Sequence, residues 1–176
     1  MPPSPSPRVP PPPLIVAVIG EGKPTPEAAA LAEAVGEGLA TAGAVLVCGG
    51  LGGVMEAACR GAARRGGVCI GILPGRSHTD ANPYVTYPIP TGLGHARNIV
   101  VVRSAHAVIA VGGRFGTLSE IAFAKVEGIP VVGLKTWRLA RDGEEDEDAL
   151  LRASDAKQAV ELALAAARER AETKGT

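Results

Sequence analysis

Short apolar runs alternate along this chain with longer segments whose apolar residues recur every three or four positions. Apolar runs of strand length, bounded by Gly and Pro, are typical of buried β-strands, and the periodic segments are typical of amphipathic helices. The pattern predicts strands at residues 14–19, 44–48, 68–73, 107–111 and 131–134, and helices at residues 26–41, 54–65, 94–104, 116–127 and 155–171. Between them, the Pro- and Gly-rich residues 74–93 predict a long loop with a short strand at 84–89, and the acidic residues 142–148 predict a solvated loop.

Strands that are apolar throughout and alternate with helices indicate an α/β fold, a doubly wound Rossmann-like parallel sheet with helices on both faces. In such folds ligands bind outside the carboxyl ends of the strands. Three glycine-bearing turns, at Gly20, at residues 49–53 and at residues 112–116, are expected at those ends. We therefore expect the functional site where the three turns meet.

The composition limits the domain organisation and the classes of partner. Eight of the fifteen prolines lie in residues 1–13, which predicts a disordered Pro-rich tail, followed by a single domain over residues 14–176. Lys plus Arg (18) balance Asp plus Glu (18) and aromatic residues are few, so a nucleic-acid partner is not expected. We expect a cytoplasmic protein with no membrane span, since no secretory signal or long apolar segment appears. We expect no metal site, since neither the cysteines nor the scattered histidines have metal-ligand spacing. Its three cysteines, Cys48, Cys59 and Cys69, are expected to be reduced and buried.

The turn Gly112-Gly113-Arg114-Phe115-Gly116-Thr117 leads from a predicted strand into a predicted helix. Exposed backbone N–H groups and the helix dipole favour an anion at such a point. The chain lacks both the dinucleotide pattern G-x-G-x-x-G with its acidic residue and a Walker lysine, which argues against NAD and against P-loop ATP chemistry. A single phosphate or a small phosphorylated ligand remains as the expected ligand of this turn.

Arg97, Asn98 and Glu120 are the polar candidates near this turn. Arg97 either pairs with a phosphate or with sugar hydroxyls in the cleft, or lies on the surface, and Asn98 is a weaker candidate of the same kind. Glu120 either acts as an acid/base or stabilises positive charge on a sugar, or it belongs to an ordinary capping box with Thr117 as the cap. The residues alone leave both alternatives open.

Residues 94–120, GHARNIVVVRSAHAVIAVGGRFGTLSE, resemble the double motif of the LOG (lonely guy) family, long misannotated as lysine decarboxylases. In that family an H-x-R-K helix is followed, after a strand, by P-G-G-x-G-T-x-x-E. The segment GGLGGVMEAACRGAARRGG at residues 49–67 also resembles the family's earlier glycine-rich turn. The resemblance spans residues 14–135. Lysine decarboxylation itself is set aside, because we expect no lysine with supporting residues at the cleft, whether Lys23, Lys125, Lys135, Lys157 or Lys174.

The resemblance implies two alternative functions. LOG enzymes are nucleoside 5′-monophosphate phosphoribohydrolases, which release the free base and ribose 5-phosphate, and Arg97 and Glu120 match their catalytic arginine and glutamate. However, Val111 replaces the motif proline, Asn98 replaces the lysine, and Arg114-Phe115 adds a residue. These departures resemble a sister branch that includes molybdenum cofactor carrier proteins, which bind a phosphorylated pterin without hydrolysis. A single-strand DNA binder of the DNA-processing type is a third alternative, disfavoured by the zero net charge and few aromatic residues.

We thus expect a LOG-like protein that binds a small phosphorylated ligand, with no required cofactor and with molybdenum cofactor as a candidate bound ligand. Apolar surface on the helices at 26–41 and 116–127 predicts a homo-oligomer, a homodimer or a homotetramer. The predicted catalytic residues are Arg97 and Glu120, and the predicted ligand-binding residues are Gly20, Gly49, Gly50, Gly52, Gly53, Asn98, Gly112, Gly113, Arg114, Phe115, Gly116 and Thr117.

Overall fold

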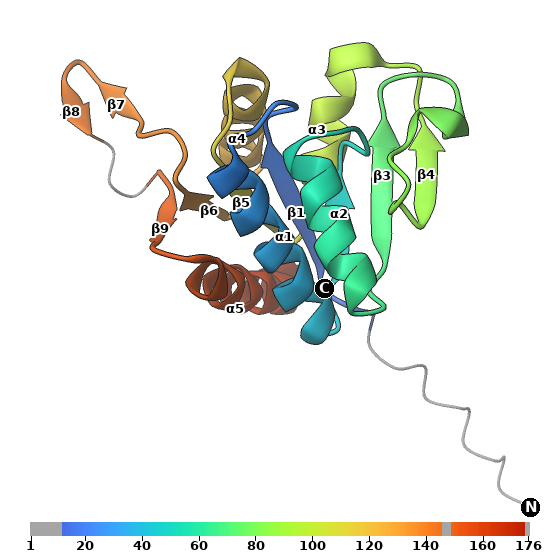
Figure 1. Cartoon of the computed structure of the whole chain (residues 1–176). Helices are drawn as coiled ribbons and strands as arrows, with labels where there is room; N and C mark the ends of the chain where they lie inside the picture. The colour runs from blue at the N-terminus through green and yellow to red at the C-terminus, as the bar shows by residue number, and fades with distance from the viewer. Residues whose placement is uncertain (1–11, 146–148, 175–176) are drawn as a thin grey trace, which may run out of the picture.

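A computed structural model describes residues 12–145 and 149–174, so most of the predicted Pro-rich tail lies outside the described residues. Seven parallel strands form one sheet in the order β4-β3-β2-β1-β5-β6-β9, and the order reverses between β1 and β5 (Figure 1). This is the predicted doubly wound Rossmann-like fold. The strands are β1 Ile15–Gly20, β2 Val45–Cys48, β3 Cys69–Leu73, β4 Tyr87–Pro90, β5 Ala107–Val111, β6 Val131–Leu134 and β9 Leu151–Ala153.

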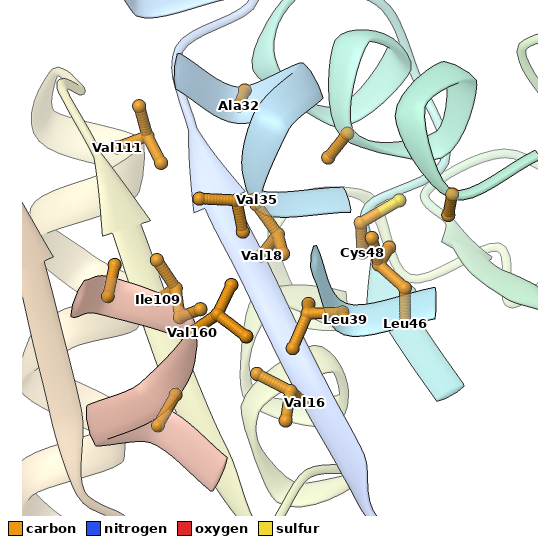
Figure 2. Close-up of a cluster of buried hydrophobic side chains, with 14 of the residues drawn as sticks. Val16, Val18, Ala32, Val35, Leu39, Leu46, Cys48, Ile109, Val111 and Val160 are labelled. Atoms are coloured by element: carbon orange, nitrogen blue, oxygen red, sulfur yellow. The ribbon is translucent and has the colours of Figure 1, made fainter. Parts of the chain in front are cut away.

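Helices cover both faces of the sheet. One face carries α1 Pro26–Thr41, α2 Val54–Arg64 and α5 Ala156–Lys174, and the other carries α3 Arg97–Arg103 and α4 Phe115–Val126 (Figure 1). Side chains alternate along β1. Val16 and Val18 pack beneath α1 in one apolar cluster (Figure 2), while Ala17 and Ile19 belong to the cluster beneath α3 and α4. Because both faces are covered, the strands are apolar throughout.

The helix α1 begins as its sequence predicts. Thr25 is the N-cap, its hydroxyl oxygen accepts a hydrogen bond from the Ala28 amide at 3.2 Å, and Pro26 occupies the first helical position. The carboxyl end of β1 lies beside the end of β5, with Gly20 in register with Val111.

Two glycines bring α1 and α2 into close contact. A Cβ added at Gly36 would overlap the carbonyl oxygen of Ala58, and one added at Gly61 would overlap that of Glu33. Arg60 of α2 also donates to the Glu33 carboxylate, at 2.7 Å. The close approach of the two helices therefore depends on glycine at both positions.

We expect Gly61→Ala to lower the free energy of unfolding by about 1–2 kcal/mol. Overpacking costs about 1–3 kcal/mol, and the better helix propensity of alanine returns at most about 1 kcal/mol. Urea unfolding monitored by circular dichroism measures the change. Gly116→Ala is the matched control, because a Cβ on that helical glycine meets no atom within 4 Å. Equal midpoints for Gly61→Ala and the wild-type protein would contradict this explanation.

Several short elements differ from the sequence prediction. The helix predicted at 94–104 begins with a separate 3-10 turn, Gly94–Ala96, and another 3-10 turn, His78–Asp80, lies in the predicted long loop. Part of the acidic stretch predicted as a loop forms an antiparallel hairpin of β7 Ala140–Arg141 and β8 Glu144–Glu145, while residues 146–148 lie outside the described residues. The edge strand β9 was not predicted, because its three residues are mostly exposed and show no apolar run.

The three cysteines are buried and unpaired, as the sequence predicts. The Sγ atoms of Cys48 and Cys59 lie 3.5 Å apart, and their hydrogen bond, together with burial, raises the pKa of the Cys48 thiol well above its usual value. The Cys48 thiol is therefore a protonated packing group. None of the helices in the described ranges is long and apolar enough to cross a membrane.

Candidate ligand-binding site

A cavity of about 230 Å³ opens where the strand order reverses. It lies between the carboxyl ends of β1 and β2 and the first turns of α3 and α4, which is the usual place for a ligand in this fold. The lining residues are Val18, Ile19, Gly20, Glu21, Gly22, Gly49, Met55, His95, Arg97, Asn98, Arg114, Gly116, Thr117 and Glu120.

The backbone at the start of α4 forms a phosphate cradle, the name used here for residues 113–117. Gly112 (φ 56°) and Gly113 (φ 110°) adopt conformations that other residues rarely adopt, and they turn the chain from β5 into the helix. Arg114 is the N-cap and no side chain caps the helix, so the amides of its first turn lack partners within the helix. Together with the helix dipole, these amides favour an anion.

The capping-box alternative is wrong. The helix begins at Phe115, which makes Thr117 the third helical residue and Glu120 the sixth. Neither residue therefore occupies the position that a capping box requires. Glu120 is 6% exposed and faces the cavity.

The alternative of a surface position for Arg97 is also wrong, because Arg97 is only 8% exposed. Its Nη1 lies 3.7 Å from Oε1 of Glu120 and donates a hydrogen bond to the side-chain oxygen of Asn98. Asn98 in turn donates to the hydroxyl of Ser119 at 3.2 Å, which ties α3 to α4. The Nε of Arg97 is buried and finds no hydrogen-bond partner among the described residues. A buried donor without a partner is costly, so a ligand that accepts from this guanidinium would relieve the cost.

Burial controls the charges in the cavity. It raises the pKa of Glu120 to about 7, although the nearby Arg97 acts in the opposite direction. Burial also lowers the pKa of Arg97, but an arginine remains charged at neutral pH. Because Glu120 is only partly ionised near pH 7, it only partly neutralises Arg97, and the cavity keeps positive charge for an anion.

The glycines of the turn between β2 and α2 mainly allow the backbone conformation of that turn. Of its four predicted ligand-binding glycines, Gly49 alone lines the cavity, and a Cβ there would lie 2.6 Å from Nη2 of Arg97. Gly50 (φ 73°) and Gly53 (φ 75°) hold conformations that favour glycine, and a Cβ at Gly52 would make an ordinary contact with Oε2 of Glu56 at 3.7 Å. Gly49 therefore makes room for the arginine, while the other three lie outside the cavity lining.

Some of the remaining predicted residues line the cavity and others do not. Gly20, Asn98, Arg114, Gly116 and Thr117 line the cavity together with the predicted pair Arg97 and Glu120. Gly112, Gly113 and Phe115 shape the turn without lining the cavity. The Phe115 side chain is 79% exposed, and its ring centre lies 5.7 Å from that of Trp137.

Six lining residues were not predicted from the sequence: Val18, Ile19, Glu21, Gly22, Met55 and His95. Glu21 and Gly22 directly follow the first strand, so their place at the carboxyl edge could have been predicted. Met55 stands in the first turn of α2. His95 is exposed and precedes α3 by two residues, and its match to the histidine of the H-x-R-K motif is the signal that could have identified it.

We expect Gly116→Ala to weaken binding of inorganic phosphate about fivefold, equivalent to about 1 kcal/mol or one hydrogen bond. A methyl group at this position of the first helical turn would stand where the anion approaches, whereas it touches no atom of the protein within 4 Å. Isothermal titration measures the affinity, and urea unfolding shows that the fold is unaffected. Unchanged phosphate affinity would contradict the expectation that the anion approaches the phosphate cradle at Gly116.

Comparisons with known proteins identify the relatives of this chain. The chain is 48% identical over 120 residues to an uncharacterised protein of Archaeoglobus fulgidus, covering 68% of this chain and 79% of that protein. Its fold is similar to the molybdenum cofactor binding protein of Rippkaea orientalis, with a TM-score of 0.79, 34% identity, and coverage of 87% of this chain and 96% of that one. It is equally similar to the molybdenum cofactor carrier protein of Chlamydomonas reinhardtii, with a TM-score of 0.78, 33% identity, and coverage of 88% and 98%. The model of the SLOG cluster4 family matches residues 13–167, and the chain belongs to that family of LOG-like Rossmann proteins.

Proposed function

We propose that this protein binds the phosphorylated pterin of molybdenum cofactor and carries it without turnover. The observation that carries the proposal is the likeness to two molybdenum cofactor proteins, at 34% and 33% identity over nearly their whole length. The departures from the LOG motif at Asn98, Val111 and Arg114-Phe115 favour the same branch.

The site supports this role with groups suited to a phosphate. The phosphate cradle offers backbone amides, and Arg97 offers an unpartnered Nε–H and a charge that Glu120 only partly neutralises. Hydrogen bonds between charged groups are stronger than neutral ones, so this combination anchors the ligand by its phosphate. The cargo would be held by these groups of the protein, with Asn98 orienting the guanidinium.

A phosphoribohydrolase is the second candidate, and the buried Arg97–Glu120 pair favours it. Cleavage of an N-glycosidic bond passes through an oxocarbenium-like state, which an ionised carboxylate beside the sugar carbon would stabilise. Glu120, however, is almost fully buried, and burial raises its pKa to about 7. A carboxyl that is partly protonated at neutral pH is a weaker stabiliser of that state, and this favours binding over hydrolysis.

Incubation with ligands followed by gel filtration distinguishes a carrier from a phosphoribohydrolase. The protein is mixed separately with molybdenum cofactor and with AMP, GMP or CMP, and both the retained ligand and the released free base are quantified. The carrier function is expected to give retained pterin and no free base. Release of base from any monophosphate, abolished by Glu120→Gln, would instead establish hydrolysis. Failure to retain molybdenum cofactor would refute the carrier function.

The predicted homo-oligomer remains a prediction. Its best candidate surface is an apolar groove of about 850 Å³ between α1 and α5, whose walls include Ala30, Ala34, Val160 and Leu164. Apolar surface of this kind is typical of subunit contacts. Light scattering at micromolar concentration that gave the mass of one chain, 17.8 kDa, would refute it.

A further inference from the structure

A second cavity, of about 220 Å³, adjoins the first on the α1 side of the sheet. It lies over the carboxyl end of β5, and its walls include the apolar side chains of Ala28, Leu31 and Val111. Its polar groups include Glu21 and Lys135. Glu21 lines both cavities, so the two share this residue next to the point where the strand order reverses.

Neither cavity alone has the volume that is usual for a small-molecule site. Pockets that enclose a small-molecule ligand usually measure about 300–1,000 Å³, and each of these cavities falls below that range. Taken together they reach it. Ligands of doubly wound folds commonly extend across the crevice at the reversal point, so a ligand anchored by phosphate in the first cavity has room for its remaining part in the second.

Lys135 is held at this place by an unusual backbone. Its φ is +51°, a value uncommon for a residue that is not glycine. The hydroxyl of the next residue, Thr136, donates to the carbonyl oxygen of Gly112, which ties the end of β6 to the glycine turn. Such conformations cluster at functional sites. Lys135 is ion-paired with Glu27 and lines the second cavity beside the glycine turn.

Glu21 is available to a ligand in the same region. Its Oε1 accepts a hydrogen bond from the Gly113 amide at 3.4 Å, which is long and therefore weak. A phosphate at the cradle would take over that amide and release the carboxylate. The freed carboxylate could then accept two N–H bonds from one edge of a ligand.

We propose that the second cavity is a subsite for a flat heterocycle whose edge combines adjacent N–H donors with a carbonyl oxygen. Glu21 accepts from the N–H donors, Lys135 donates to the carbonyl oxygen, and the apolar wall contacts the ring. The aminopyrimidinone edge of a pterin has this arrangement, and so does guanine, whereas adenine lacks the carbonyl oxygen. The inference rests on the proposed function, because it assumes that the phosphate occupies the first cavity.

Titrations with neopterin monophosphate, GMP and AMP test the subsite. We expect the wild-type protein to bind neopterin monophosphate at least about tenfold more tightly than AMP. Glu21→Gln is expected to remove that preference, and a wild-type midpoint in urea unfolding would show that the variant is folded. Lys135→Met is expected to reduce the preference severalfold. The controls are Glu161→Gln on α5 and Lys23→Met, an exposed residue of the β1–α1 loop that lines neither cavity.

The outcomes separate this inference from the proposed function. Preference for GMP alone, lost in Glu21→Gln, would support the subsite with guanine as its ring and overturn the pterin. Equal affinity for all three ligands, unchanged by Glu21→Gln, would overturn the subsite while leaving the phosphate site intact. If none of the three binds, or if Arg97→Ala leaves their affinities unchanged, the proposed function itself fails.

Discussion

Arg97→Ala is expected to weaken phosphate binding by at least about tenfold. A hydrogen bond to a charged group contributes about 1.5–3 kcal/mol, which corresponds to a change in affinity of roughly 10- to 150-fold. The guanidinium is buried beside Glu120, its Nε has no partner among the described residues, and Gly49 leaves it space. The variant loses both the charge and the free donor.

Isothermal titration with AMP measures this loss. Arg103→Ala is the matched control, since Arg103 ends the same helix, is largely exposed and pairs with Glu127 outside the cavity. The control is expected to bind AMP like the wild-type protein. If Arg97→Ala and Arg103→Ala bound AMP equally well, Arg97 would not be a ligand-binding residue.

Glu120→Gln is expected to change the pH dependence of stability. Burial raises the pKa of Glu120 from 4.5 to about 7, so between these values the folded state binds more protons than the unfolded state. The stability of the wild-type protein therefore falls, relative to the variant, as the pH rises from 5 to 8. The full effect of such a shift is about 3 kcal/mol, since each pKa unit corresponds to about 1.4 kcal/mol.

Urea unfolding of both proteins at several pH values measures this difference. Glu33 and Asp155 have lowered pKa values and impose an opposite pH dependence, but they are present in both proteins and cancel in the comparison. Binding of phosphate at pH 6 and pH 8 can be measured in the same samples. A difference in stability that stayed constant from pH 5 to 8 would show that the pKa of Glu120 is not raised.

The main strands and helices could be predicted because burial on both faces makes the strands of a parallel sheet apolar throughout. The strand β9 and the β7–β8 hairpin could not, since strands of two or three residues have no detectable periodicity. The turns that form the site could be predicted, because the turns that follow parallel strands all lie at the carboxyl edge of the sheet.

The roles of individual site residues depended on tertiary contacts that the sequence does not display. The packing of α3 against α4 buries Arg97. The start of α4 at Phe115 excludes Glu120 from a capping box. Gly49 was predicted as a ligand contact, yet it also makes room for a guanidinium 48 residues away in the chain. The positive φ of Lys135 likewise has no signature in a run of apolar residues.

The position of the anion at the start of α4 can be measured directly by NMR. The protein is labelled with ¹⁵N and titrated with inorganic phosphate while the backbone amide signals are followed. We expect the amides of Gly113, Gly116 and Thr117 to shift together and to saturate with one dissociation constant, which Arg97→Ala raises at least about tenfold. Saturable shifts confined to other parts of the chain, with these three amides unmoved, would contradict the phosphate site and the function built on it.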